Sequence, residues 1–118
     1  MAEWIDFEGK KILFFNCKGF HVEAFLRELD VLEREYEKAG TAGGKNRLLV
    51  LFDITDTDHT NDAVKNRLEE IAKKGKAAGI AFVGVTGIKR IIAGAIRPDA
   101  YFGKTLAAAK EWLVKRID

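Results

Sequence analysis

The feature that most constrains this chain is an unbroken apolar run, Leu48 to Phe52, that leads directly into an acidic loop. Consecutive apolar residues of this kind are typical of a strand that is buried on both faces of a parallel sheet. Residues 53–60 are then rich in Asp and Thr, and a helical pattern begins near Asn61. In open α/β sheets, binding sites lie outside the carboxyl ends of the strands, so this loop is the first place to look for function.

Other stretches predict strands before and after this central run. Residues 3–8 alternate between polar and apolar side chains, which indicates an edge strand, and Gly9-Lys10 predicts the tight turn to a second strand over 11–18. Residues 80–85 predict another buried strand, and residues 100–102 a short edge strand.

Four segments carry the helical spacing of apolar residues instead: 20–39, a stretch from about 61, one from Thr86 to 96, and one that begins after a capping Thr105. Strands that alternate with helices predict parallel pairs, and the opening hairpin adds an antiparallel pair. The sequence therefore predicts a single α/β domain over residues 1–118. It has a mixed, mostly parallel sheet of four or five strands, an N-terminal β-hairpin and about four covering helices.

The cysteine content and the apolar runs of the sequence indicate the cellular compartment. Cys17 is the sole cysteine, so an intramolecular disulfide is excluded, and its apolar neighbours predict a buried, inert thiol. The first residues lack the basic region and apolar run of a signal peptide. No apolar run reaches the roughly 18 residues that a membrane span needs. We therefore expect a cytoplasmic protein without a transmembrane segment.

Charge is unevenly distributed along the chain. The net charge of +2 is too small to indicate nucleic acid as a partner. Residues 1–60 hold eight Lys and Arg against twelve Asp and Glu, whereas residues 61–118 hold twelve against six. This asymmetry favours an acidic partner or peripheral contact with an anionic membrane surface, and the alternative is a set of solvated helix faces.

Four segments, together with the order of elements, resemble the STAS/SpoIIAA-like family, which is often grouped with Sec14-like lipid-binding folds. They are residues 9–13, 48–55, 83–89 and 105–113, and the third contains a Val-Gly-Val-Thr-Gly join from strand to helix. The resemblance runs from about residue 4 to 117 and implies a SpoIIAA-like fold.

The family also implies a function. Its anti-sigma-factor antagonists are phosphorylated on a serine at the start of the helix after the central strand. That position falls at 61–63 here, and the chain contains no serine. The resemblance therefore implies a non-catalytic regulatory or protein-interaction module that lacks the phosphorylatable serine.

We expect the acidic loop and the helix that follows it to form a partner-binding surface, with a protein or a second copy of the chain as the partner. Its predicted residues are Asp53, Asp56, Asp58, His59, Thr60, Asp62 and Arg67. The structural alternative is that clustered acids before a helix form turns and helix caps.

The spacing Asp56-x-Asp58-x-Thr60 also resembles the nucleophile motif of haloacid-dehalogenase-type phosphatases, which implies Mg²⁺ and a downstream acidic pair. The only aspartates after the next helix are Asp99 and Asp118. Read as a calcium loop, the same stretch has Arg67 where a bidentate Glu is required. We therefore predict no catalytic residue, no metal site and no cofactor, with a Mg²⁺-dependent phosphatase as the remaining alternative.

A second candidate site lies at the start of the third predicted helix. Backbone N–H groups at a helix start bind anions, and basic side chains follow here. The helix itself is apolar around much of its circumference, which favours burial, a dimer face or the wall of a Sec14-like pocket for a lipid or another small apolar molecule. The predicted anion- or ligand-binding residues are Thr86, Gly87, Lys89, Arg90 and Ile92.

Overall fold

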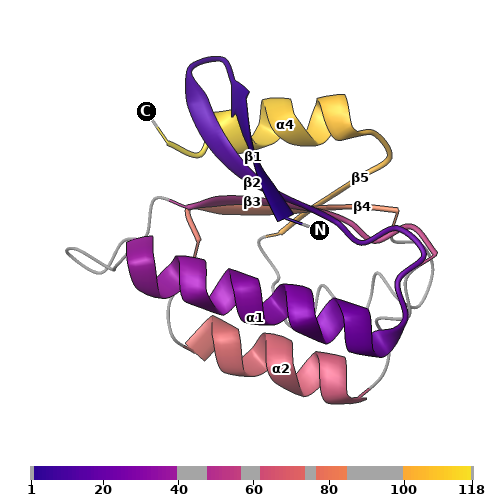
Figure 1. Cartoon of the computed structure of the whole chain (residues 1–118). Coiled ribbons are helices and arrows are strands. Elements are labelled where there is room, and N and C mark those ends of the chain that lie inside the picture. Colours follow the sequence, from indigo (N-terminus) through magenta and orange to yellow (C-terminus); the bar gives the residue numbers. More distant parts are fainter. Residues whose placement is uncertain (1, 40–47, 57–61, 74–76, 85–99, 118) are drawn as a thin grey trace.

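The computed structural model describes residues 2–39, 48–56, 62–73, 77–84 and 100–117 (Figure 1). Their elements are, in order, β1 (Ala2–Phe7), β2 (Lys10–Asn16), α1 (Val22–Ala39), β3 (Leu49–Asp53), α2 (Asp62–Lys73), β4 (Gly79–Val83), β5 (Tyr101–Gly103) and α4 (Leu106–Val114). Each predicted strand has a counterpart among them, and so do three predicted helices. The predicted helix over 86–96 lies outside the described residues.

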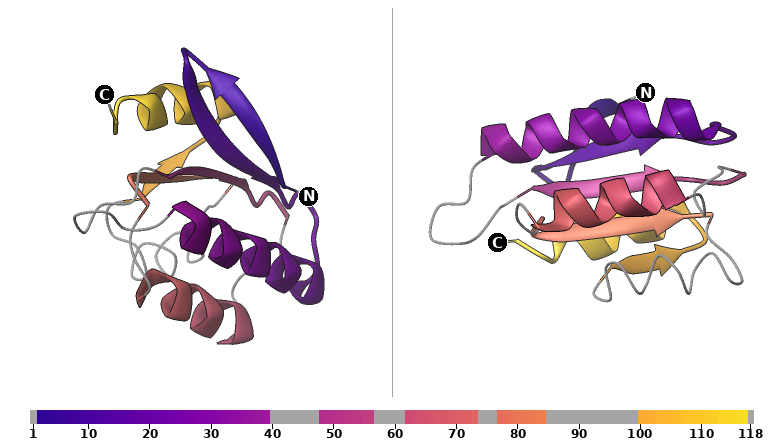
Figure 2. Two further views of the ribbon diagram at one scale, coloured as in Figure 1. Left: turned by 60° about the vertical axis from the view of Figure 1, so that its left-hand side comes forward. Right: turned by 90° about the horizontal axis from the view of Figure 1, so that it is seen from below.

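The strands form one sheet in the order β1-β2-β3-β4-β5. β1 and β2 are antiparallel, and the three pairs that follow are parallel. Among the described helices, α1 and α2 cover one face and α4 covers the other (Figures 1 and 2). The predicted mixed, mostly parallel sheet with an N-terminal hairpin is confirmed.

The turn of the hairpin lies one residue earlier than the sequence predicted. Phe7 pairs with Lys10, so Glu8 and Gly9 are the two loop residues, and the predicted Gly9-Lys10 turn is wrong. Their φ angles are 50° and 77°. Positive φ at both central residues defines a type I′ turn, whose twist matches that of the flanking strands.

Four phenylalanines form a row across the sheet on the face covered by α1 and α2. Phe15, Phe52, Phe82 and Phe102 are neighbours in the register of β2 to β5. Successive ring centroids lie 4.7, 5.4 and 5.5 Å apart, and the rings are within 14° of parallel. Phe25 of α1 approaches Phe52 at 6.1 Å. Because in-register strands are about 4.8 Å apart, the backbone spacing itself brings these rings into stacking contact.

The opposite face carries a second apolar cluster under α4, which includes Leu49, Leu51 and Leu113. The helix begins at the predicted cap, where Thr105 Oγ1 accepts a hydrogen bond from Ala108 N at 3.2 Å. No helix in the described part of the chain is long and apolar enough to span a bilayer.

The hairpin is tied to the end of α4. Lys10 Nζ donates to the carbonyl oxygens of Val114 and Ile117 at 2.5 and 2.6 Å. Carbonyls at a helix C-terminus lack partners within the helix, so a lysine at this position satisfies them. The contact links the second strand to residues more than a hundred positions later.

Replacing Phe52 by alanine should strongly destabilise the protein. Phe52 is fully buried and contacts three other rings, so we expect a loss of about 3–5 kcal/mol in the free energy of unfolding, measured with urea. Phe102→Ala is the matched control at the partly buried end of the row, and its loss should be smaller. Equal losses would contradict a row centred on β3.

Candidate functional site

The loops that follow β2 and β3 are joined by backbone hydrogen bonds beyond the ends of the strands. Cys17 N donates to Asp53 O at 2.9 Å, and Gly19 N donates to Thr55 O at 2.8 Å. Parallel strands bring their carboxyl ends to one edge of the sheet, and these bonds hold the two loops together there. This is the edge at which the sequence placed the acidic loop.

Asp53 is the last residue of β3, and its carboxylate shapes the loop. Oδ1 accepts hydrogen bonds from Thr55 N at 3.1 Å and from Thr55 Oγ1 at 2.8 Å. A carboxylate that binds the backbone two residues later forms an Asx turn, which stops the strand. Asp53 is half-buried, so its first role is to hold the loop in one conformation.

Two further predicted residues, Asp56 and Asp62, are exposed. Asp56 has a φ of 56°, in the left-handed region that Asp and Asn tolerate better than most residues. Asp62 is the first residue of α2, where a negative charge is favoured by the positive end of the helix dipole. Both carboxylates are therefore accommodated by the local backbone and stay in contact with solvent.

Gly84 makes the closest approach between the loops after β3 and β4. Its φ is 89°, and a Cβ atom there would lie 2.1 Å from Thr55 Oγ1 and 2.7 Å from Thr55 Cα. Only glycine fits this position. The sequence prediction did not single out Gly84 or Thr55 for this role, although a glycine at the end of a buried strand is a signal of close backbone approach.

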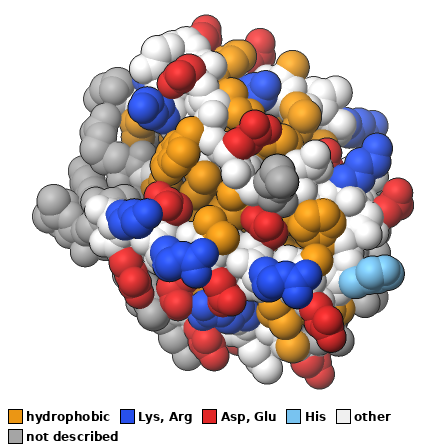
Figure 3. Space-filling model, viewed as in Figure 1, with side chains coloured by type: hydrophobic (Ala, Val, Ile, Leu, Met, Phe, Trp, Pro, Cys, Tyr) orange, Lys and Arg blue, Asp and Glu red, His pale blue; other side chains and the backbone are white. Residues whose placement is uncertain are grey.

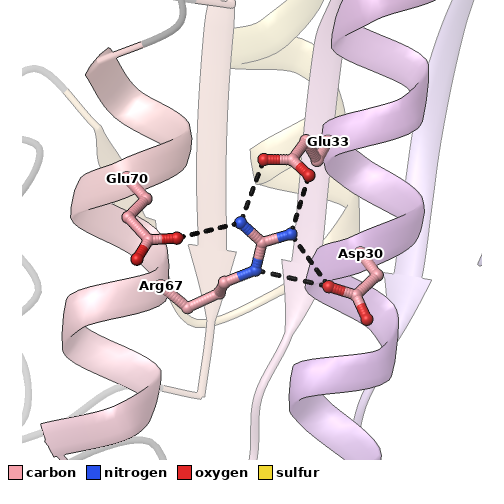
Figure 4. A network of polar contacts seen from close by, with 4 residues as sticks. All are labelled: Asp30, Glu33, Arg67 and Glu70. Atoms are coloured by element: carbon pink, nitrogen blue, oxygen red, sulfur yellow. Dashed lines mark hydrogen bonds and ion pairs between the residues drawn. The ribbon is translucent and has the colours of Figure 1, made fainter.

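Arg67 joins the two helices on this face of the sheet (Figure 4). Its Nη1 and Nη2 atoms bind both carboxylate oxygens of Glu33 at 2.9 Å, and Nη2 also binds Asp30 Oδ1 at 2.8 Å. Glu70 of α2 completes the cluster at 3.2 Å. A bidentate guanidinium–carboxylate pair is among the stronger polar contacts on a protein surface, so α2 is held against α1 at a defined point.

The hydrogen bonds with Glu33, followed by those with Asp30, raise the pKa of the Arg67 guanidinium above its ordinary range. Its side chain is 20% exposed. Arg67, predicted as a partner-binding residue, is thus engaged within the molecule. Nothing in the spacing of the sequence marks the two acids of α1 as its partners.

Cys17 lies directly behind this edge. The residue is buried, and burial raises the pKa of its thiol to about 12, with further upward contributions from the charges of Glu28 and Asp53. The thiol therefore stays protonated across the physiological range and is a poor nucleophile. The predicted buried thiol is confirmed.

The remaining predicted site residues fall outside the described part of the chain. They are Asp58, His59, Thr60, Thr86, Gly87, Lys89, Arg90 and Ile92. Within the described ranges, no group of three or more His, Cys, Asp or Glu residues could hold a metal ion. For these residues, the partner-binding surface and the anion- or ligand-binding site remain predictions.

Known proteins allow the architecture to be compared. No family model and no curated protein matches the chain. Among solved structures, it is similar to an uncharacterized protein of the DUF3478 family with a SpoIIAA-like fold, from Shewanella loihica PV-4. The TM-score is 0.64, the match covers 96% of this chain and 92% of that chain, and 18% of residues are identical. The fold is SpoIIAA-like. The resemblance expected from the sequence is confirmed at the level of the fold.

The close approach at Gly84 generates a paired prediction. Gly84→Ala and Gly19→Ala both place a side chain at positive φ, which costs about 1–2 kcal/mol. A Cβ at Gly19 meets nothing within 4 Å, whereas at Gly84 it collides with Thr55. We therefore expect Gly84→Ala to lose about 1–3 kcal/mol more than Gly19→Ala in urea unfolding. Equal losses would show that the contact with Thr55 relaxes freely.

Proposed function

We propose that this chain is a non-catalytic protein-interaction module of the STAS-like type, which binds a protein partner through an acidic surface at the carboxyl edge of β3. We call this the carboxyl-edge surface and define it by Asp53, Asp56 and Asp62. The observation that carries the proposal is that Asp56 and Asp62 are exposed while the Asp53–Thr55 turn fixes the loop from which Asp56 projects. The predicted residues Asp58, His59 and Thr60 lie between them in the sequence and are included in the proposed surface.

The charge of this surface indicates the chemistry of the partner. The uneven charge of the chain favoured an acidic partner, but within Asp62–Lys73 three Lys and Arg are balanced by three Asp and Glu. Arg67 is moreover engaged with carboxylates of α1 and α2. Asp56 and Asp62 are therefore the exposed charges that define this surface, and a partner with Lys or Arg at its contact surface is favoured. Such an encounter is weakened by salt.

Preorganisation supports a binding role. The Asp53–Thr55 turn holds the loop, and Arg67 fixes α2 against α1. Residues that are held in place before a partner binds lose little conformational entropy on binding. Arg67→Glu would place a fourth carboxylate in this cluster and disturb the helix pair, so it is a poor probe of binding.

The absence of serine bears on regulation. Asp62 supplies a permanent carboxylate near the position at which the resemblance implies a phosphorylatable serine. A phosphorylated side chain switches its charge, whereas an aspartate at neutral pH does not. We infer an interaction that is controlled by the partner rather than by serine phosphorylation of this chain.

Removing the two exposed charges of the carboxyl-edge surface should weaken binding. The Asp56→Asn/Asp62→Asn double variant removes two charges, and asparagine tolerates the left-handed backbone of Asp56. We expect at least about tenfold weaker binding of the partner recovered by affinity capture, measured by biolayer interferometry.

The matched control is Glu111→Gln. Glu111 is an exposed carboxylate on α4, which covers the face of the sheet away from α1 and α2. It should leave binding unchanged. A partner that binds the double variant as tightly as the original chain contradicts the proposed surface.

A second candidate function rests on the phenylalanine row. Phe102, at its end, is only partly buried, and the apolar helix predicted around Ile92 precedes β5 in the sequence. An apolar small molecule or lipid beside this row is the alternative. The Mg²⁺-phosphatase reading gains no support, because β3 ends at Asp53 and Asp56 lies beyond the strand.

Native mass spectrometry of the freshly purified chain separates these candidates. The interaction module predicts the mass of the chain alone or of a complex with a protein. Extra mass that is lost on denaturation and extracts into organic solvent favours the apolar ligand, and Phe102→Ala should then reduce the fraction of ligand-bound chain.

A further inference from the structure

We propose that the outer edge of β1 binds an extended, basic segment of a partner protein by strand addition. Here the carboxylates Glu3, Asp6 and Glu8 flank an exposed Trp4. This surface is separate from the carboxyl-edge surface and does not depend on it. The two proposals can therefore fail independently.

The backbone of β1 has hydrogen-bonding groups available on one side. β1 is an edge strand, and no other described element runs along its outer side (Figures 1 and 2). In a two-residue hairpin the residues that close the turn, here Phe7 and Lys10, are a hydrogen-bonded pair, and the direction of the bonds alternates along the strand. The N–H and C=O groups of Ala2, Trp4 and Asp6 therefore point outward. They match an added strand of a few residues.

The side chains along this edge combine charges of one sign with an exposed aromatic ring. Charged side chains usually keep an edge strand from pairing with another strand, and the carboxylates of β1 do so against an acidic partner but not against a basic one. Trp4 is moreover 49% exposed, and among the described residues it is the exposed large hydrophobic side chain. On the face shown in Figure 3, hydrophobic side chains lie above a row of charged side chains that runs along α1. An exposed tryptophan in the middle of an edge strand favours binding of another chain and does not protect the edge from it.

The charge of β1 selects the partner. Residues 2–8 contain three carboxylates, all exposed, and no Lys or Arg. The ammonium group of Lys10 is engaged with the carbonyls at the end of α4, and Lys11 is the exposed cation opposite Asp6. A second copy of this chain would bring three more carboxylates to the same edge, and like charges across paired strands are destabilising. The occupant is therefore a basic segment rather than another β1.

The register gives that segment a spacing. The side chains of Trp4 and Asp6 share one face of the strand, because alternate residues face the same way. A Lys or Arg opposite Asp6 forms an ion pair, and a second one, two residues along, lies over the Trp4 ring as a cation–π contact. The segment thus has the pattern Lys/Arg-x-Lys/Arg, and apolar residues at x meet the face of Ile5.

Two labelled peptides of equal composition and charge test this spacing on the whole chain. One is acetyl-Thr-Lys-Val-Arg-Val-Lys-Thr-amide, with alternating basic residues, and the other is acetyl-Thr-Lys-Arg-Val-Val-Lys-Thr-amide, in which no two basic residues stand two positions apart. In fluorescence anisotropy at physiological salt, we expect the alternating peptide to bind at least about tenfold more tightly, because it alone can place one cation opposite Asp6 and another over Trp4.

Variants of β1 test the edge itself. Trp4→Ala and Asp6→Lys should each weaken the alternating peptide about tenfold. Asp6→Asn removes the carboxylate charge alone. Asp6→Pro also removes an outward N–H group and leaves the hydrogen bonds to β2 intact, so it should weaken peptide binding more than Asp6→Asn does. Asp56→Asn, in the carboxyl-edge surface, and Glu69→Lys, on α2, should leave peptide binding unchanged. Thermal unfolding followed by circular dichroism identifies variants that remain folded.

Three results would overturn the proposal. The first is equal affinity for the two peptides, which indicates charge attraction without strand addition. The second is full binding by folded Trp4→Ala and Asp6→Pro variants. The third is a dimer in light scattering that Trp4→Ala dissociates, which assigns the edge to a second copy. If Asp56→Asn loses binding and the β1 variants keep it, the peptide binds the carboxyl-edge surface and not β1.

Discussion

The in-register stacking of phenylalanines across β2, β3, β4 and β5 is the contact on which the rest of this structure depends. It runs through the centre of the core, and Phe25 of α1 packs directly on its central ring. Each ring belongs to the next-to-last residue of its strand. The row therefore holds the four strands in one register and also fills the core. A slip of one residue in any strand would turn its ring to the α4 face and break the row.

This fixed register sets the geometry of the carboxyl edge. Asn16, Asp53 and Val83 come to the same level across three strands, and the loops beyond them are bonded to one another. Asp53 then closes its turn on Thr55, and Gly84 leaves room for that threonine. Asp53 and Asp56 are therefore held at an edge where the loops are joined by hydrogen bonds. The β1 edge, by contrast, takes its properties from being the outermost strand.

Periodicity was enough to predict most of the fold, because burial dominates where strands and helices form. Residues 48–52 were assigned to a buried strand, and β3 occupies Leu49–Asp53. The hairpin turn was missed by one residue, since nothing local marks Glu8 as the residue that adopts positive φ. Local chemistry predicted, as the structural alternative for the acidic loop, a turn such as the one that Asp53 forms with Thr55. The Arg67 cluster depends on how α1 and α2 pack together, which no single segment encodes.

The contact of Lys10 with the end of α4 has a consequence for how the chain acquires its structure. The hairpin is synthesised before α4, but the carbonyls that receive its lysine belong to Val114 and Ile117. Until those residues leave the ribosome, the apolar face formed by Ile12, Leu49 and Leu51 lacks the cover that α4 provides. Sequence-distant contacts close late and at an entropic cost. This face is thus completed by α4, and a nascent chain that stalls before α4 exposes apolar side chains of the sheet to chaperones and proteases.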